Sequence, residues 1–284
     1  MFTDSYVTPR RLEVLISVLR EYSRRDWKRE TLYHTLQPEG LSGGVSNRDP
    51  ARATIAAASE LGLVEEKAGV IELAPRAEAK RPVRHTVLDA LDREVLAKTD
   101  VEPWFGLFYA FQLGLGAEGA KPCTADNWAK RFLAEALHSV PYPNPFNGTK
   151  HSGLMRWFPY AGLGWIDGRR TFQANPYERL RRALPHVFGT SKRLNGDDFM
   201  VGLANACPEL DGGNLFRQVN GSWDVRGKVC TLGLSHALVD LHLAGHLRLV
   251  GTVDSRGWSV QLANPPRTDF AGRIDFVELP GGDN

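Results

Sequence analysis

A helix that ends at glycine and runs directly into a short β-hairpin occurs three times in this chain of 284 residues. The segments are residues 61–75 (LGLVEEKAGVIELAP), 161–176 (AGLGWIDGRRTFQANP) and 244–265 (AGHLRLVGTVDSRGWSVQLANP). In each, glycine supplies the left-handed backbone that ends a helix, and strand-type residues then flank a tight turn. The repetition predicts a mainly α-helical chain with small β-hairpins (α+β), built from three similar units.

The elements before the first hairpin follow a familiar order. Thr8 and Pro9 start one helix, a second is expected near residues 28–36, and Asp49-Pro50 starts a third. Three helices followed by a hairpin resemble the winged-helix domain of transcription regulators. The resemblance implies three tandem winged-helix-like domains, in which each hairpin is the wing.

Basic and apolar stretches set the expected domain boundaries. Residues 76–85 carry four Lys or Arg side chains and one acid, and residues 104–115 are apolar almost all round, as in a buried helix. The predicted divisions are a winged-helix domain at 1–80, a basic helical linker at 81–102, and winged-helix-like domains at 103–190 and 194–284.

The third domain is expected to contain the clearest hairpin. Strand-type residues alternate along both of its arms: Leu247, Leu249, Val253, Trp258, Val260 and Leu262. Asp197 and Asp198 are expected to cap its first helix. Its other expected elements are helices at 214–219 and 231–245 and strands at 223–225 and 273–279.

The winged-helix resemblance places possible DNA contacts in the first domain, because in that family the third helix lies in the major groove. The residues in position to read bases are Ser46, Asn47, Arg48, Arg52 and Thr54. Those in position to contact phosphates are Arg24, Arg25, Lys28 and Arg29. However, Glu65 and Glu66 put negative charge on this wing, so an ordinary solvated face for Arg48 and Arg52 is an equally good interpretation.

The second domain has the better chemistry for nucleic acid. Its third helix carries Lys150, His151 and Arg156, and the tip of its hairpin carries Arg169 and Arg170. Basic residues on helix and wing together are what phosphate contacts require. The next helix also carries three arginines, for which a solvent face is at least as good an interpretation: Arg179, Arg181 and Arg182.

The sequence offers little for catalysis, and we expect neither an enzyme nor a cofactor. His242 and His246 share a helix face, but the glutamate that a metalloprotease places after its first histidine is replaced by Leu243. A phosphate-binding glycine loop and a nucleophile elbow are both missing from the sequence, and the three cysteines form no Cys-x-x-Cys pair. The N-terminus lacks the apolar run of a signal peptide, so we expect a cytoplasmic protein without membrane contact.

Two classes of function remain. In one the chain binds DNA through helix–wing surfaces, as a subunit of a complex or as a transcription regulator. In the other its winged helices form a scaffold that docks proteins, as in the tandem winged-helix subunits of chromosome-organising complexes. A net charge of only +2 favours the scaffold, whereas the local basic clusters favour DNA.

The overall layout also resembles DpdG-type accessory proteins of bacterial DNA-modification and anti-phage defence clusters. The resemblance rests on chain length, on the N-terminal Thr-Pro-Arg-Arg-Leu helix and on the repeated Leu-Gly-Leu-Val type of helix exit. It implies a non-catalytic subunit that works on DNA beside other protein subunits, such as a helicase or a nuclease.

Overall fold

The computed structural model describes residues 6–38, 40, 48–78, 80–98, 102–137, 144–221, 227–252, 254–261 and 270–280. The chain divides into two compact units, one of residues 1–103 with 149–157 and the other of residues 104–148 with 158–284. The boundaries of the three domains expected from the sequence stay predictions.

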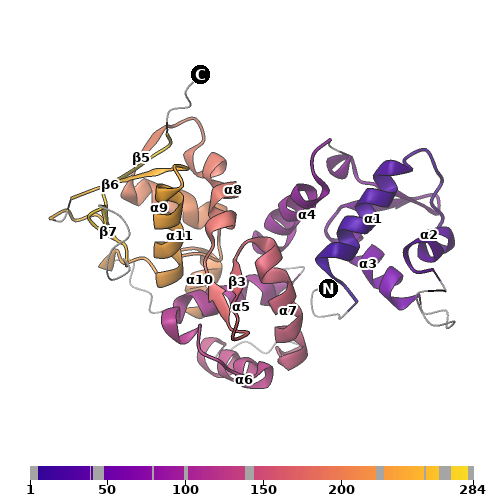
Figure 1. The fold of residues 1–284 in the computed structure, drawn as a ribbon, viewed down its shortest axis with the longest axis horizontal. Helices are drawn as coiled ribbons and strands as arrows, with labels where there is room; N and C mark the ends of the chain where they lie inside the picture. Colours follow the sequence, from indigo (N-terminus) through magenta and orange to yellow (C-terminus); the bar gives the residue numbers. More distant parts are fainter. Residues whose placement is uncertain are drawn as a thin grey trace. The chain divides into compact units, whose positions relative to one another are not determined.

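The first unit begins with three helices and a hairpin (Figure 1). Its elements are α1 (Pro9–Glu21), α2 (Arg29–Leu36), α3 (Asp49–Glu60), β1 (Val64–Lys67), β2 (Val70–Leu73), a short 3-10 turn (Pro75–Ala77), α4 (Val83–Leu91) and a π-helical turn (Asp92–Leu96). The Thr8 hydroxyl accepts a hydrogen bond from the Arg11 amide, as predicted for the N-cap of α1. Helix α1 packs on α3, α4 and β2 through an apolar face: Leu12, Leu15, Ile16 and Leu19.

The first hairpin has an additional partner that the sequence did not reveal. Strands β1 and β2 pair antiparallel, with Val64 opposite Leu73. On the other edge of β2, the Ile71 amide donates to the Trp27 carbonyl oxygen at 2.8 Å, and Lys28 forms a bridge with Val70. This pairing fixes the start of α2 against the hairpin.

The second unit is also mainly helical. Its helices are α5 (Pro103–Gly114), a 3-10 turn (Gly116–Glu118), α6 (Ala125–Ala136), the last residues of α7 (Gly148–Ala161), α8 (Tyr177–Phe188), α9 (Gly196–Ala206), α10 (Asn214–Val219) and α11 (Leu232–Leu243). Its strands are β3 (Gly164–Ile166), β4 (Phe172–Ala174), β5 (Arg193–Asn195), β6 (Arg248–Val250), β7 (Trp258–Ser259), β8 (Arg273–Ile274) and β9 (Phe276–Glu278).

Helix α5 forms the aromatic core of the second unit, as its apolar composition predicted. Phe108 lies with its ring centre 5.2 Å from that of Phe132 and 4.8 Å from that of Phe146. Phe105 packs edge-on against Phe158 at 5.2 Å. Aromatic pairs at these separations contribute beyond simple burial, so α5 anchors the elements around it.

The three predicted helix exits are confirmed. Gly62, Gly162 and Gly245 have φ of 58°, 75° and 73°, the left-handed region that favours glycine. The hydrogen bonds repeat as well. In the first exit the Gly62 amide donates to the Ser59 carbonyl and the Leu63 amide to the Ala58 carbonyl, and the other two exits have equivalent pairs. This pair of hydrogen bonds at the end of a helix is the Schellman motif.

Gly164 lies two residues beyond Gly162, and its backbone conformation also requires glycine. Its φ is 152°, and a Cβ atom placed on it would lie 2.1 Å from the Gln173 carbonyl oxygen on the paired strand. We therefore expect Gly164→Ala to lower the free energy of unfolding by about 2 kcal/mol or more. Gly168→Ala is the matched control, because a Cβ atom there meets nothing within 4 Å. Equal melting temperatures for the two variants, by thermal denaturation, would contradict the prediction.

The predicted third hairpin is wrong in its pairing. Strand β6 does not pair with the strand that follows it. Instead β9 lies between β5 and β6, while β7 pairs with β8. The physical reason is burial, because Val277 of β9 is fully buried opposite Leu194 and Leu249. The predicted strand at 223–225 and the positions Val253 and Leu262 lie outside the described residues.

The cap of α9 also differs from its prediction. The Asn195 side chain, rather than Asp197 or Asp198, accepts the capping hydrogen bond, from the Asp198 amide at 2.8 Å. Overall the fold is mainly helical with small antiparallel sheets of two and three strands. Among the described residues, no helix is long and apolar enough to cross a membrane.

Candidate nucleic-acid interface

The wing of the first unit neutralises one of the arginines expected to contact phosphate. The Arg29 guanidinium donates from Nε to both carboxylate oxygens of Glu66, at 3.1 and 3.0 Å, and its Nη2 contacts the same carboxylate. These hydrogen bonds lower the pKa of Glu66 and raise that of Arg29. A phosphate would therefore have to compete with an ion pair that is already formed.

The other predicted contacts around α3 are similarly engaged. Arg48 pairs with Glu30, and its Nη2 lies 3.1 Å from His34 Nε2. Arg52 lies over the Tyr33 ring, 5.7 Å from its centre. The Thr54 hydroxyl is buried and donates to the Pro50 carbonyl, so it does not face a groove of DNA. Ser46 and Asn47 lie outside the described residues.

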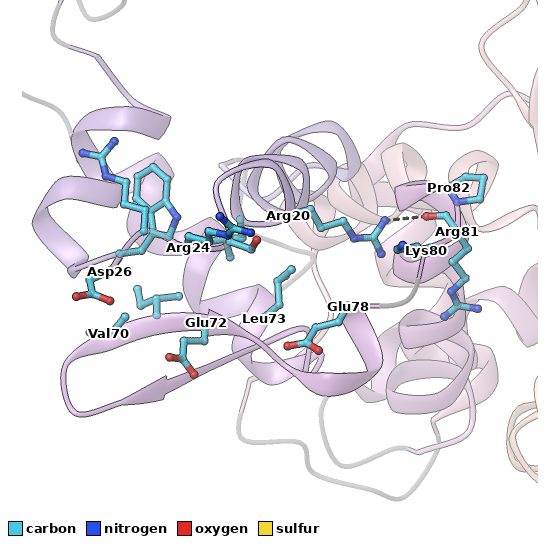
Figure 2. Close-up of a pocket in the computed structure, with 15 residues that line it drawn as sticks. Arg20, Arg24, Asp26, Val70, Glu72, Leu73, Glu78, Lys80, Arg81 and Pro82 are labelled. Atoms are coloured by element: carbon cyan, nitrogen blue, oxygen red, sulfur yellow. Dashed lines mark hydrogen bonds between the residues drawn. The ribbon is translucent and has the colours of Figure 1, made fainter.

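Arg24 and Arg25 line a cavity of about 820 Å³ in the first unit (Figure 2). One wall is fixed by Arg20, whose Nε and Nη2 donate to the Ala77 carbonyl at 3.0 and 2.7 Å. Its Nη1 donates to the Arg81 carbonyl at 2.7 Å, the bond drawn in Figure 2. Burial and the nearby Arg81 charge lower the pKa of Arg20. Arg20 therefore has a structural role in this cavity.

The lining of this cavity carries both signs of charge, with more basic than acidic residues. Besides Arg20, its basic residues are Arg24, Arg25, Lys80 and Arg81, and its acidic residues are Asp26, Glu72 and Glu78. Arg25 also lies over the Trp27 ring, 4.5 Å from its centre. Lys28 is exposed at the start of α2 but does not line the cavity. The three carboxylates offset part of the positive charge of this cavity, which weakens it as a phosphate site.

Helix α7 exposes fewer basic groups than its sequence suggests. Lys150 is only 5% exposed, and burial lowers its pKa while Glu102 counteracts this shift. His151 is also buried, which lowers its pKa to about 4 and keeps the ring neutral at pH 7. Of the three predicted residues on this helix, Arg156 alone is exposed.

The β3–β4 hairpin presents its two arginines on a rigid turn. The Asp167 carboxylate accepts hydrogen bonds from the backbone amides of Arg169 and Thr171, at 2.9 and 3.0 Å, and these bonds lower its pKa. Gln173 Nε2 also donates to it at 3.1 Å. Arg170 adopts a φ of 61°, within the left-handed region. Both arginine side chains are exposed, and neither has a carboxylate partner among the described residues.

The same hairpin exposes two large apolar side chains. Trp165 is 51% exposed and Ile166 is 44% exposed. The sequence predicted both residues as strand residues but not as surface groups. Both residues lie on β3 of the two-stranded sheet β3-β4. An exposed tryptophan beside unpaired arginines is typical of a binding surface.

The arginines of α8 have structural partners. Arg179 is buried and donates to Glu209, Arg181 pairs with Glu178, and Arg182 donates to the Ala161 carbonyl. The solvent-face interpretation thus fits Arg181 alone. In contrast to these three residues, Arg169 and Arg170 of the β3–β4 hairpin are exposed and have no carboxylate partner in the described structure.

His242 lies on α11, but His246 lies beyond its end at Leu243, so the two do not share a helix face as predicted. His242 Nδ1 accepts a hydrogen bond from the Leu249 amide at 3.4 Å, whereas the His246 ring lies 6.1 Å from that of Tyr177. In the part of the chain that the structure describes, no group of three His, Cys, Asp or Glu side chains is placed to hold a metal ion.

The comparisons with known proteins give one match. No curated protein and no solved structure matches the chain. A family model described as DpdG-like matches residues 3–255, which is most of the chain. The chain therefore belongs to the DpdG-like family of accessory proteins of DNA-modification (Dpd) defence systems.

Proposed function

We propose that the chain is a non-catalytic, DNA-contacting subunit of its defence system, and that it touches DNA through the β3–β4 hairpin. The observation that carries this proposal is the exposed pair Arg169 and Arg170 on a turn fixed by Asp167. Arginine contacts to phosphate need exposed, unpaired guanidinium groups in a defined geometry. The first unit meets this requirement less well, because Glu66 and Glu30 hold Arg29 and Arg48.

We further infer that two parts of the chain are winged-helix domains. In the first, Trp27 and Lys28 supply the small strand before α2, and β1–β2 is the wing. In the second, α8, α9 and α11 are the three helices, and the strand order β5-β9-β6 is the sheet order of a winged helix. The paired strands β7 and β8, which follow β6 in the chain, then belong to its wing. In this arrangement α8 starts the third domain.

The proposed partners are DNA and other protein components of the Dpd system, such as a helicase or a nuclease. A docking scaffold without DNA contact is the second candidate function, and the exposure of Trp165 and Ile166 favours it to some extent. Exposed aromatic and aliphatic side chains are enriched at the centres of protein interfaces. The unpaired arginines between these strands favour DNA, because exposed guanidinium groups bind phosphates directly.

Replacement of both hairpin arginines is the direct test. We expect Arg169→Ala with Arg170→Ala to weaken binding to a random-sequence duplex and to reduce the slope of log Kd against log salt by roughly two. The measurement is fluorescence anisotropy at low and near-physiological salt.

The control must remove the same net charge elsewhere. Arg131→Ala with Arg181→Ala serves this purpose, because both arginines are paired with glutamates on their own helices. Equal weakening by both double variants would mean that only net charge matters. Absence of duplex binding by the unaltered protein at low salt would overturn the DNA proposal in favour of the scaffold.

A further inference from the structure

A pocket of about 460 Å³ lies at the base of the β3–β4 hairpin, within the second unit. Trp165 and Tyr177 provide its aromatic lining, and Gly162 and Gly164 also line it. Its polar end is formed by Asp240 of α11, whose Oδ2 accepts a hydrogen bond from Asn175 Nδ2 at 3.2 Å. Asn175 is itself held by the Tyr177 amide, which donates to its Oδ1 at 3.0 Å.

The lining of this pocket selects for a flat ligand with hydrogen-bond donors. Aromatic walls favour a planar ring that stacks on them. Among the described residues that line the pocket, Glu178 and Asp240 are acidic and none is basic. A phosphate is therefore disfavoured inside it. A carboxylate group has two acceptor oxygens with about four lone-pair sites, so Asp240 offers hydrogen-bond acceptors to a ligand.

We propose that this pocket binds an unpaired nucleobase that presents an amino group, such as adenine or cytosine, from a single strand of DNA. This inference rests on the proposed DNA contact of the hairpin. Trp165 stands on β3 and the two arginines follow at the turn, so one hairpin supplies both a stacking surface and phosphate contacts. That combination is how sequence-tolerant single-strand binding works.

A positively charged side chain of a partner protein is the competing occupant, because aromatic walls and carboxylates also suit a cation. The hairpin tip weighs against it. Arg169 and Arg170 are exposed and unpaired within the described structure, so they repel a basic segment that approaches along the hairpin. The same two charges attract the phosphates on either side of an unpaired base.

The test compares fluorescently labelled oligo(dA), oligo(dC) and oligo(dT) by anisotropy, beside a duplex. We expect oligo(dA) and oligo(dC) to bind more tightly than oligo(dT), which has no exocyclic amine. Trp165→Ala should weaken single-strand binding roughly five- to a hundredfold while duplex affinity stays within about twofold. Asp240→Asn should abolish the preference over oligo(dT), because its amide can donate to thymine carbonyls.

Two further variants keep the interpretation clear. Trp165→Phe should restore most of the single-strand affinity, and Ile166→Ala is a matched exposed control outside the pocket. If the protein binds duplex but Trp165→Ala and Asp240→Asn change nothing with single strands, the base pocket fails and the DNA function stands. If it binds no DNA at all, both fail. Binding of an oligoarginine peptide that Asp240→Asn abolishes, with oligonucleotides unaffected, would assign the pocket to a partner protein.

Discussion

Replacement of Arg179 with methionine is expected to lower the free energy of unfolding by about 3–5 kcal/mol. Arg179 Nε donates to Glu209 Oε1 at 2.9 Å, and its Nη2 donates to the Ala206 carbonyl at 2.9 Å. The two ionic side chains are 4% and 0% exposed. Loss of the guanidinium removes the ion pair of a buried carboxylate, and this costs more than the loss of an exposed pair.

The matched control is Arg181→Met on the same helix. Arg181 pairs with Glu178, and both side chains are exposed, so its loss should change stability by less than about 1 kcal/mol. Combining Arg179→Met with Glu209→Met should recover much of the loss, because the buried charge is then removed as well. Urea denaturation gives the free energy of unfolding of the two single variants and of the double variant. An Arg179→Met loss no larger than that of Arg181→Met would contradict a structural role for the buried pair.

The helix exits were predictable from sequence because they depend on neighbouring residues. The amides of Gly62, Gly162 and Gly245 each donate to the carbonyl three residues earlier, and the amide of the following residue donates to the carbonyl five residues before it. Glycine and the apolar residues around it are sufficient to specify such a motif. The same holds for the Thr8 cap of α1 and for the buried α5.

Strand pairing in the third repeat was not predictable in this way. The alternation of Leu247, Leu249 and Trp258 correctly marks extended, half-buried backbone, but alternation does not name the partner strand. β6 pairs with β9, roughly 30 residues further along, and β5 completes the sheet from before α9. Such long-range strand pairing depends on which strand places a buried side chain in the core of the unit. Here β9 does so with Val277.

The candidate site likewise contains features that local sequence predicts and features that depend on distant residues. Local sequence identified Arg169 and Arg170 as the tip of a tight turn. It did not reveal that Glu66 would hold Arg29, a residue 37 positions away, or that Lys150 would be buried. It also did not reveal that Trp165 would be exposed. The exposed and unpaired Arg169 and Arg170 therefore define the surface on which function is proposed, rather than the number of basic residues.

Asp211 should make the second unit less stable as the pH rises from about 4 to about 7. The carboxyl group is buried, and burial raises its pKa from 3.8 to about 7, although hydrogen bonds from the Thr231 amide and hydroxyl at 2.6 and 2.8 Å oppose this shift. Between these pH values the folded state keeps a proton that the unfolded state releases. The free energy of unfolding therefore falls with rising pH, by roughly 4 kcal/mol across the window, and is unaffected by this group above it.

His151 acts with the opposite sign, so the unaltered protein alone is not diagnostic. Burial lowers the pKa of His151 to about 4, so the unfolded state binds the extra proton below pH 6.5 and stability falls as the pH falls. The informative quantity is the difference between the unaltered protein and Asp211→Asn, measured by urea denaturation at pH 5 and pH 8. The amide does not titrate, so the variant should lack the Asp211 contribution of about 2–3 kcal/mol over that interval. Identical pH slopes would mean that Asp211 is ionised in the folded protein, and that its bonds to Thr231 outweigh its burial.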